Sequence, residues 1–173
     1  MDMNHLLLVT AQLESSNIMY ALGGSGMLLS LGLTDTVNDW DIMTDTPKEQ
    51  ILKALQHFTI KETTGAEYPF GTEYKLAIHG DDPQVEILGK FAIYNDQQLC
   101  NIPTIPATIW QGVQVSAPEV WYVAYALMER TAKADLLLEY LKGKPANKDV
   151  INQLMKEPLP EFIAKQLECI SRT

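Results

Sequence analysis

The pattern of hydrophobic and polar positions predicts an α+β chain. Hydrophobic and polar residues alternate between Val37 and Met43, the two-residue period of a half-buried strand. Short β-rich segments recur up to residue 115, and helix-forming segments separated by Gly or Pro follow it. The predicted strands span 17–22, 37–43, 58–62, 72–79, 84–88, 91–94 and 110–115, and the predicted helices span 4–16, 26–31, 47–57, 117–131, 133–142, 146–156 and 159–171.

The composition changes near Ser116, and we predict a domain boundary there. Residues 1–115 are expected to form a mixed β-sheet with flanking helices. Residues 116–173 are expected to form a C-terminal helical subdomain. The chain of 173 residues is long enough for one domain with a small appendage.

Three polar residues stand where helix N-caps are expected. Ser25 precedes the predicted helix 26–31, so its side chain can accept a bond from a free backbone N–H. Thr46 and Ser116 are each followed three residues later by a glutamate, which is the pattern of a capping box.

Charge is distributed unevenly along the chain, which carries a formal net charge of −9. Residues 1–128 contain 5 Lys/Arg and 15 Asp/Glu, whereas residues 129–173 contain 8 and 7. An acidic chain is a poor electrostatic match for a long nucleic acid, although a small anion could be held by a metal and by the basic tail. No apolar run approaches the length of a membrane helix, and we expect a cytoplasmic protein without a membrane partner.

Candidate chemistry is concentrated between Tyr20 and Thr44, in YALGGSGMLLSLGLTDTVNDWDIMT. Asp39 and Asp41 lie two residues apart on a predicted strand, so both carboxylates point to one face and can bind a hard cation. Taken alone, this pair is more typical of an exposed strand edge or turn with two solvated aspartates.

The Gly23-Gly24-Ser25 turn lies between a predicted strand and a predicted helix. Glycines allow close approach to a ligand, and amides at a helix start attract anions. The turn lacks the Lys-Ser/Thr of a P-loop and the third glycine of a Rossmann fingerprint. Alone it also fits a plain strand-to-helix turn. Together with the aspartates it predicts phosphate and metal at one end of the sheet.

The apolar-Gly-Gly-Ser pattern, followed by a helix and Asp-x-Asp, resembles the DNA polymerase beta-type nucleotidyltransferase superfamily. The resemblance covers about residues 17–90 and is closest to small single-chain members of the antibiotic and toxin types. It implies a nucleotidyltransferase-like fold. It also implies a third acidic residue on a later strand, which Glu86 in QVEILG matches.

The resemblance implies roles for these residues. Asp39, Asp41 and Glu86 would be catalytic residues and ligands for Mg²⁺ or Mn²⁺, and Glu86 could instead help to deprotonate the acceptor hydroxyl. Gly23, Gly24 and Ser25 would bind the phosphates of an NTP, for which ATP is the commonest choice in the superfamily. In the tail, Arg130 and Lys133 match part of a basic stretch that follows the core in several families, and they would contact phosphate or form a solvated basic face.

The sequence does not identify the acceptor and does not show whether the protein catalyses a reaction or only binds a nucleotide. A nucleoside monophosphate would move to a hydroxyl of a small molecule, a protein or an RNA end. The alternative is a protein that has the same fold but no catalytic activity, and that binds a nucleotide or a protein partner. The oligomeric state is not indicated by the sequence.

Overall fold

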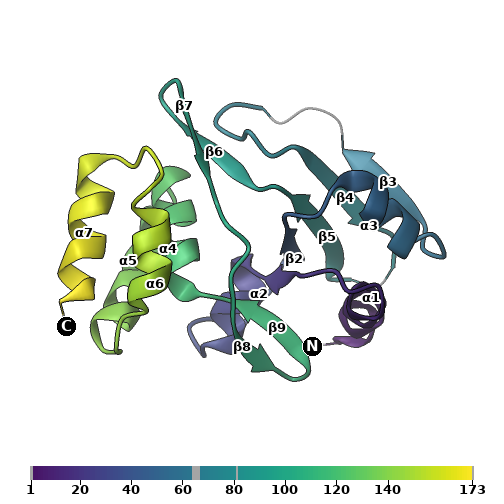
Figure 1. The fold of residues 1–173 in the computed structure, drawn as a ribbon. Coiled ribbons are helices and arrows are strands. Elements are labelled where there is room, and N and C mark those ends of the chain that lie inside the picture. The colour runs from purple at the N-terminus through teal and green to yellow at the C-terminus, as the bar shows by residue number, and fades with distance from the viewer. Residues whose placement is uncertain (1, 64–66, 81, 173) are drawn as a thin grey trace.

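A mixed β-sheet forms the centre of the chain (Figure 1). The computed structural model describes residues 2–63, 67–80 and 82–172. Within them, one sheet has seven strands in the order β3-β4-β5-β2-β1-β9-β8, and β6 pairs with β7 in a separate hairpin. The strands are β1 (Ala21–Leu22), β2 (Asp39–Thr44), β3 (Ile60–Thr63), β4 (Tyr74–Ile78), β5 (Gln84–Gly89), β6 (Ala92–Asn95), β7 (Gln98–Asn101), β8 (Pro106–Trp110) and β9 (Val113–Ser116).

Helices flank the sheet and then continue to the C-terminal end. The predicted α+β fold with a C-terminal helical segment is therefore confirmed. In Figure 1, α4 to α7 lie together on the left, while α1 and α3 lie on the opposite side of the molecule. The helices are α1 (Asn4–Ser15), α2 (Gly24–Ser30), α3 (Lys48–Ala54), α4 (Pro118–Leu127), α5 (Thr131–Lys142), α6 (Lys148–Leu154) and α7 (Glu161–Ser171).

The central strand β2 has two different faces. Trp40 and Ile42 are fully or almost fully buried on one face, where α2 packs against the sheet. Gly26 of α2 allows this contact, because a Cβ atom there would lie 2.9 Å from the Trp40 ring and 2.8 Å from the Leu22 side chain. Asp39 and Asp41 alternate with these apolar residues and therefore point to the other face.

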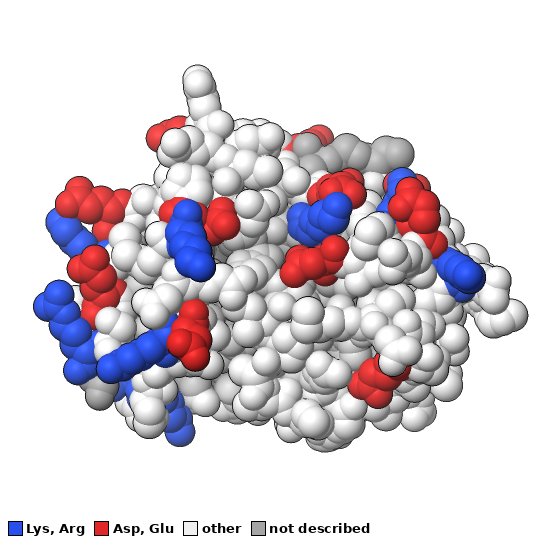
Figure 2. All heavy atoms as spheres, viewed as in Figure 1, with Lys and Arg blue, Asp and Glu red and all other residues white. Residues whose placement is uncertain are grey.

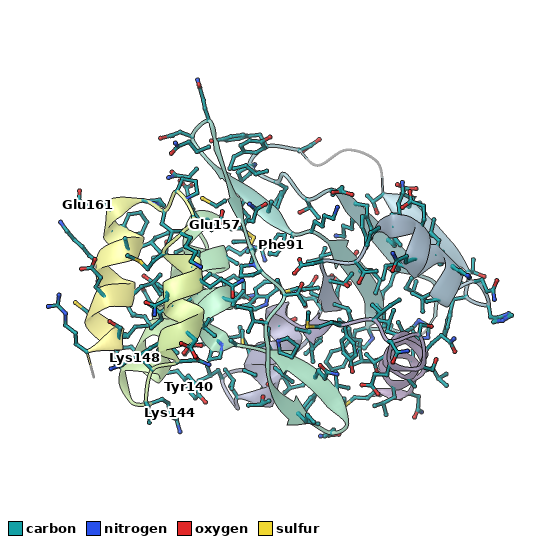
Figure 3. All side chains as sticks on the ribbon, in the orientation of Figure 1. Phe91, Tyr140, Lys144, Lys148, Glu157 and Glu161 are labelled. Atoms are coloured by element: carbon teal, nitrogen blue, oxygen red, sulfur yellow. The ribbon has the colours of Figure 1, made fainter. Side chains whose placement is uncertain are left out.

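The C-terminal helices reach the sheet on the face that carries the aspartates. Trp121 of α4 donates a bond from Nε1 to Sδ of Met43, at 3.1 Å, and Met43 follows Asp41 by two residues on the same face. The Trp121 ring also lies 5.7 Å from the Phe91 ring, between centroids. Figure 3 places Phe91 between the C-terminal helices and the sheet. The helical segment therefore forms one wall beside the carboxylates.

Several predicted strands differ from the observed ones. The predicted strand 17–22 is paired only at Ala21–Leu22. The predicted strand 110–115 is in fact a hairpin, because β8 ends at Trp110, a turn follows at Gln111–Gly112, and β9 begins at Val113. β7 and most of β8 have largely exposed side chains, so their sequences lack the apolar alternation that would have revealed them.

The three predicted side-chain caps are wrong. Gly23 is the N-cap of α2, so Ser25 lies inside the helix, and Pro47 rather than Thr46 is the N-cap of α3. Ser116 belongs to β9, and Ala117 is the N-cap of α4. The observed N-cap lies two residues before Ser25 and one residue after Thr46 and Ser116, a difference that local sequence patterns do not specify.

None of the helices in the described parts of the chain is long and apolar enough to cross a membrane.

Candidate functional site

Strand register brings two of the candidate carboxylates side by side. β2 and β5 are parallel, and Asp41 lies directly opposite Glu86, while Asp39 lies opposite Gln84. Directly opposed residues point to the same face of a sheet, so Asp39, Asp41 and Glu86 share one face. The buried neighbours of Asp41 and Glu86 along each strand hold the two strands in this register.

The glycine turn lies against the same carboxylate. The Gly23 N–H donates to the main-chain carbonyl of Asp41 at 2.8 Å. Gly24 has a φ of +54°, and a Cβ atom there would collide with Oδ2 of Asp41. Both the backbone conformation and the close approach therefore require glycine at residue 24. Ser25 follows in the first turn of α2 and is half-buried.

Glycine is required at residue 23 because a different side chain lies close to its backbone. A Cβ atom at residue 23 would collide with the Trp121 ring. The two glycines thus allow the sheet face and the C-terminal helix α4 to approach the same turn from two sides. This contact with Trp121 could not be predicted from the sequence, because the two residues lie almost a hundred positions apart.

Glu86 is already paired with a cation that sequence analysis did not indicate. The Lys75 Nζ atom of β4 lies 2.5 Å from Oε2 of Glu86. Ala77 is directly opposite Glu86 in the antiparallel β4–β5 pair, so Lys75, two residues away, points to the same face. A signal exists in the sequence, because the predicted strands 72–79 and 84–88 are joined by a short turn, and the register of such a hairpin places a lysine beside the glutamate.

The electrostatic environment of Asp41 opposes its ionisation. Burial, and then the negative charge of Glu86, raises the pKa of Asp41 from 3.8 to about 7. Asp39 also raises this pKa, and the opposing effects of Lys75 and Arg130 do not offset the increase. Any further cation that approaches Asp41 would therefore stabilise the ionised form of its carboxylate.

The donor set fits a divalent metal, although the site is not preformed. Across the described ranges, no group of three or more His, Cys, Asp or Glu residues is arranged to hold a metal ion. The carboxylates of Asp39, Asp41 and Glu86 are nevertheless hard oxygen donors on one face, as Mg²⁺ requires. The absence of a side chain at Gly24 leaves room for the Asp41 carboxylate at this position.

Arg130 and Lys133 approach the carboxylates from the start of α5. Arg130 lines the same cavity as Asp41. Lys133 Nζ lies 5.3 Å from the centroid of the Tyr125 ring. Burial, and then the positive charge of Arg130, lowers the pKa of Lys133, whereas Asp41 raises it. Figure 2 shows that basic and acidic side chains are interspersed over the C-terminal helices, as the nearly balanced charge count of residues 129–173 predicts.

A cavity of about 580 Å³ opens beside these groups. Its lining combines acidic, basic, aromatic and aliphatic side chains, with Phe70 contributed by the loop at residues 68–71. Two of the acidic lining side chains are paired, Glu62 with Lys48 at 2.7 Å and Glu73 with Lys90 at 2.9 Å. The lining residues are Asp41, Glu62, Thr63, Glu67, Phe70, Thr72, Glu73, Tyr74, Lys75, Leu88, Phe91, Trp121, Met128 and Arg130.

Comparison with known proteins identifies structural neighbours only. No protein-family model and no curated protein matches the sequence. A proposed nucleotidyltransferase from Thermotoga maritima superimposes with a TM-score of 0.60 and 21% identity, over 82% of this chain and 93% of that one. ANT(2'')-Ia in complex with adenylyl-2''-tobramycin superimposes with a TM-score of 0.54 and 12% identity, over 93% of each chain.

A solution structure of the antibiotic-resistance factor ANT(2'')-Ia gives a similar result, with a TM-score of 0.56 and 14% identity over 99% of this chain and 91% of that one. At such low identities the similarity establishes the fold. The chain has the fold of these nucleotidyltransferases, and the resemblance noted in the Gly-Gly-Ser and Asp-x-Asp motifs is confirmed at that level. A shared fold does not itself establish a shared activity.

Proposed function

We propose that this protein is a divalent-metal-dependent nucleotidyltransferase. It would move a nucleoside monophosphate from an NTP, with ATP as the first candidate, to a hydroxyl group of an acceptor. The observation that carries the proposal is the position of Asp41, which lies between Glu86 on the neighbouring strand and the Gly24 turn. Structural neighbours that are nucleotidyltransferases support it.

Asp39 and Asp41 are the proposed metal ligands, and Glu86 is proposed as a third ligand or as the group that accepts the proton of the acceptor hydroxyl. Bound Mg²⁺ or Mn²⁺ would supply positive charge that offsets the charge of the reacting phosphates. In the reaction, the hydroxyl oxygen forms a bond to the α-phosphorus while the bond to pyrophosphate breaks. Positioning and charge neutralisation are the main requirements of such a transfer.

The nucleotide would be bound from both parts of the chain. Gly23, Gly24 and Ser25 are proposed to hold the β- and γ-phosphates through the backbone of the turn. Arg130 and Lys133 would supply cations from the opposite wall. In this arrangement the predicted core, residues 1–115, carries the carboxylates, and the predicted subdomain, residues 116–173, carries the positive charge.

The cavity supports a small-molecule acceptor. Its volume of about 580 Å³ is within the usual range of about 300–1,000 Å³ for small-molecule sites. Its glutamates favour an acceptor that carries positive charge as well as a hydroxyl group. The structure of ANT(2'')-Ia with adenylyl-2''-tobramycin provides a neighbour with a small-molecule adduct. A protein or RNA end would have to enter the same cavity.

The second candidate function is a nucleotide-binding or interaction protein without turnover. The Lys75–Glu86 ion pair favours it, because this pair engages the third carboxylate in the described structure. Calorimetric titration with ATP and Mg²⁺, followed by a pyrophosphate-release assay with a panel of hydroxylated acceptors, separates the two candidates. Metal-dependent binding with pyrophosphate release supports the transferase. Binding without release across the panel supports the silent protein.

A further inference from the structure

The Lys75–Glu86 ion pair differs from the other ion pairs of the molecule. Of the five ion pairs between described residues, it is the only one that includes a candidate metal ligand. The Glu86 side chain is 16% exposed, whereas both partners in each of the other four pairs are at least 33% exposed. Ion pairs at exposed positions have little energetic effect, so this pair is the one in which the loss of either partner would matter most.

The position of Lys75 follows from the sheet rather than from a flexible loop. β4 is antiparallel to β5, and Lys75 lies diagonally across from Glu86 on the carboxylate face. Its side chain is 39% exposed and lines the cavity that Asp41 also lines. The ammonium group therefore lies beside the carboxylates but has open space into which it can move.

We propose that Lys75 is the resident counter-ion of Glu86 and that it sets the affinity of the site for divalent cations. An ammonium group and a divalent cation repel each other, and both are attracted to the same carboxylate. Glu86 therefore becomes available to a metal only when Lys75 moves away from it toward the cavity. This inference rests on the proposed function, since it takes Asp39, Asp41 and Glu86 as the metal ligands.

Lys75 acts in this proposal as a positioning residue. It neutralises Glu86 while no metal is bound, and it competes with the metal during binding. A purely structural ion pair would behave differently, because its loss would change the thermal stability of the protein and leave metal affinity unchanged. Metal affinity is therefore the readout that distinguishes the two roles.

The test is a titration of the full chain with Mn²⁺, in which free Mn²⁺ is measured by electron paramagnetic resonance. Lys75→Met is expected to lower the Kd for Mn²⁺ about tenfold, because a like charge near the ligands is removed. Lys75→Arg retains the charge and is expected to stay within about twofold of the wild type. Circular dichroism and thermal unfolding confirm that each variant is folded.

Lys90→Met is the matched control. Lys90 pairs with Glu73 at 2.9 Å, and Glu73 lines the same cavity, so this variant makes the same change in net charge without touching the candidate ligands. Its Kd for Mn²⁺ is expected to change by less than about twofold. In the Glu86→Gln background, the effect of Lys75→Met is expected to disappear, as a double-mutant cycle for a shared carboxylate requires.

Equal Mn²⁺ affinities for Lys75→Met and the wild type would overturn the inference. Equal increases in Mn²⁺ affinity for Lys75→Met and Lys90→Met would also overturn it. Weaker binding by Lys75→Met would also overturn it. Failure of the proposed function is a separate result. In that case Mn²⁺ binding would respond to Lys75 as described, while no acceptor would support release of pyrophosphate from an NTP.

Discussion

The two faces of the β2–β5 strand pair are built from the same sequence segments but have opposite properties. On one face, Trp40, Ile42, Val85 and Ile87 are fully or almost fully buried. On the other, Asp39, Asp41 and Glu86 are partly exposed carboxylates, and Asp41 lines the cavity. The apolar face gains stability from burial, whereas the carboxylate face concentrates negative charge. Substitutions on the two faces should therefore affect different properties.

The clearest test of this contrast is Asp41→Asn. We expect transferase activity to fall by about 10⁴-fold, or roughly 5 kcal/mol, because a proposed metal ligand is lost. The fold should remain intact, since asparagine has the same shape. Asp35→Asn, at an exposed turn residue, is the control and should retain activity. The measurement is pyrophosphate release with an acceptor found by the panel assay, and normal release by Asp41→Asn would refute the assignment.

The matching change on the apolar face is Trp40→Ala. Trp40 is 1% exposed and contacts the helix that carries Gly26, so its truncation leaves a cavity. We expect a loss of about 4 kcal/mol in the free energy of unfolding. Urea denaturation provides the measurement. Trp110→Ala, at a half-buried residue of edge strand β8, should lose distinctly less, and equal losses would contradict the ranking of these two positions.

Gly24→Ala tests the contact between the turn and the carboxylate face. The variant should weaken Mg²⁺-dependent ATP binding about 30-fold, or roughly 2 kcal/mol, because its Cβ atom would displace the Asp41 carboxylate. Gly32→Ala is a matched control, since Gly32 also has a positive φ, of +73°, but a Cβ atom there would have no described neighbour within 4 Å. Both variants carry backbone strain. If both weakened ATP binding equally, strain rather than the Asp41 contact would be the cause.

The pH dependence of stability tests the charge that is concentrated on the carboxylate face. The pKa of Asp41 is about 7 in the folded chain and takes its ordinary value of 3.8 when unfolded, so the folded chain binds more protons between these values. The free energy of unfolding of the metal-free protein should therefore fall as the pH rises from about 4 to 7.

Urea denaturation at several pH values, with and without Mg²⁺, provides this measurement. The charges that act on Asp41 are those of Glu86, Lys75, Asp39 and Arg130, and Mg²⁺ should reduce the slope by offsetting the carboxylates. Asp41→Asn should remove the contribution of this residue. An unchanged slope in Asp41→Asn would show that other groups cause the pH dependence.

Local sequence patterns predict the elements whose apolar residues recur with a regular period or whose ends are marked by Gly or Pro. The long C-terminal helices and the strand that carries both aspartates belong to this group. Strands β7 and β8 do not show such a pattern, because their side chains are mostly exposed. The predicted cap at Ser116 is wrong because the residue is paired in β9, opposite Pro106, a contact with a strand that the local pattern does not reveal.

For the site, alternation along one strand is enough to place Asp39 and Asp41 on the same face, because the side-chain direction in a strand is a local property. The family resemblance then indicates Glu86 and the Gly-Gly-Ser turn. Only the tertiary structure decided that Gly24 contacts Asp41 and that Trp121 packs against Gly23. These contacts depend on strand register and helix packing between distant segments, which short-range patterns do not determine.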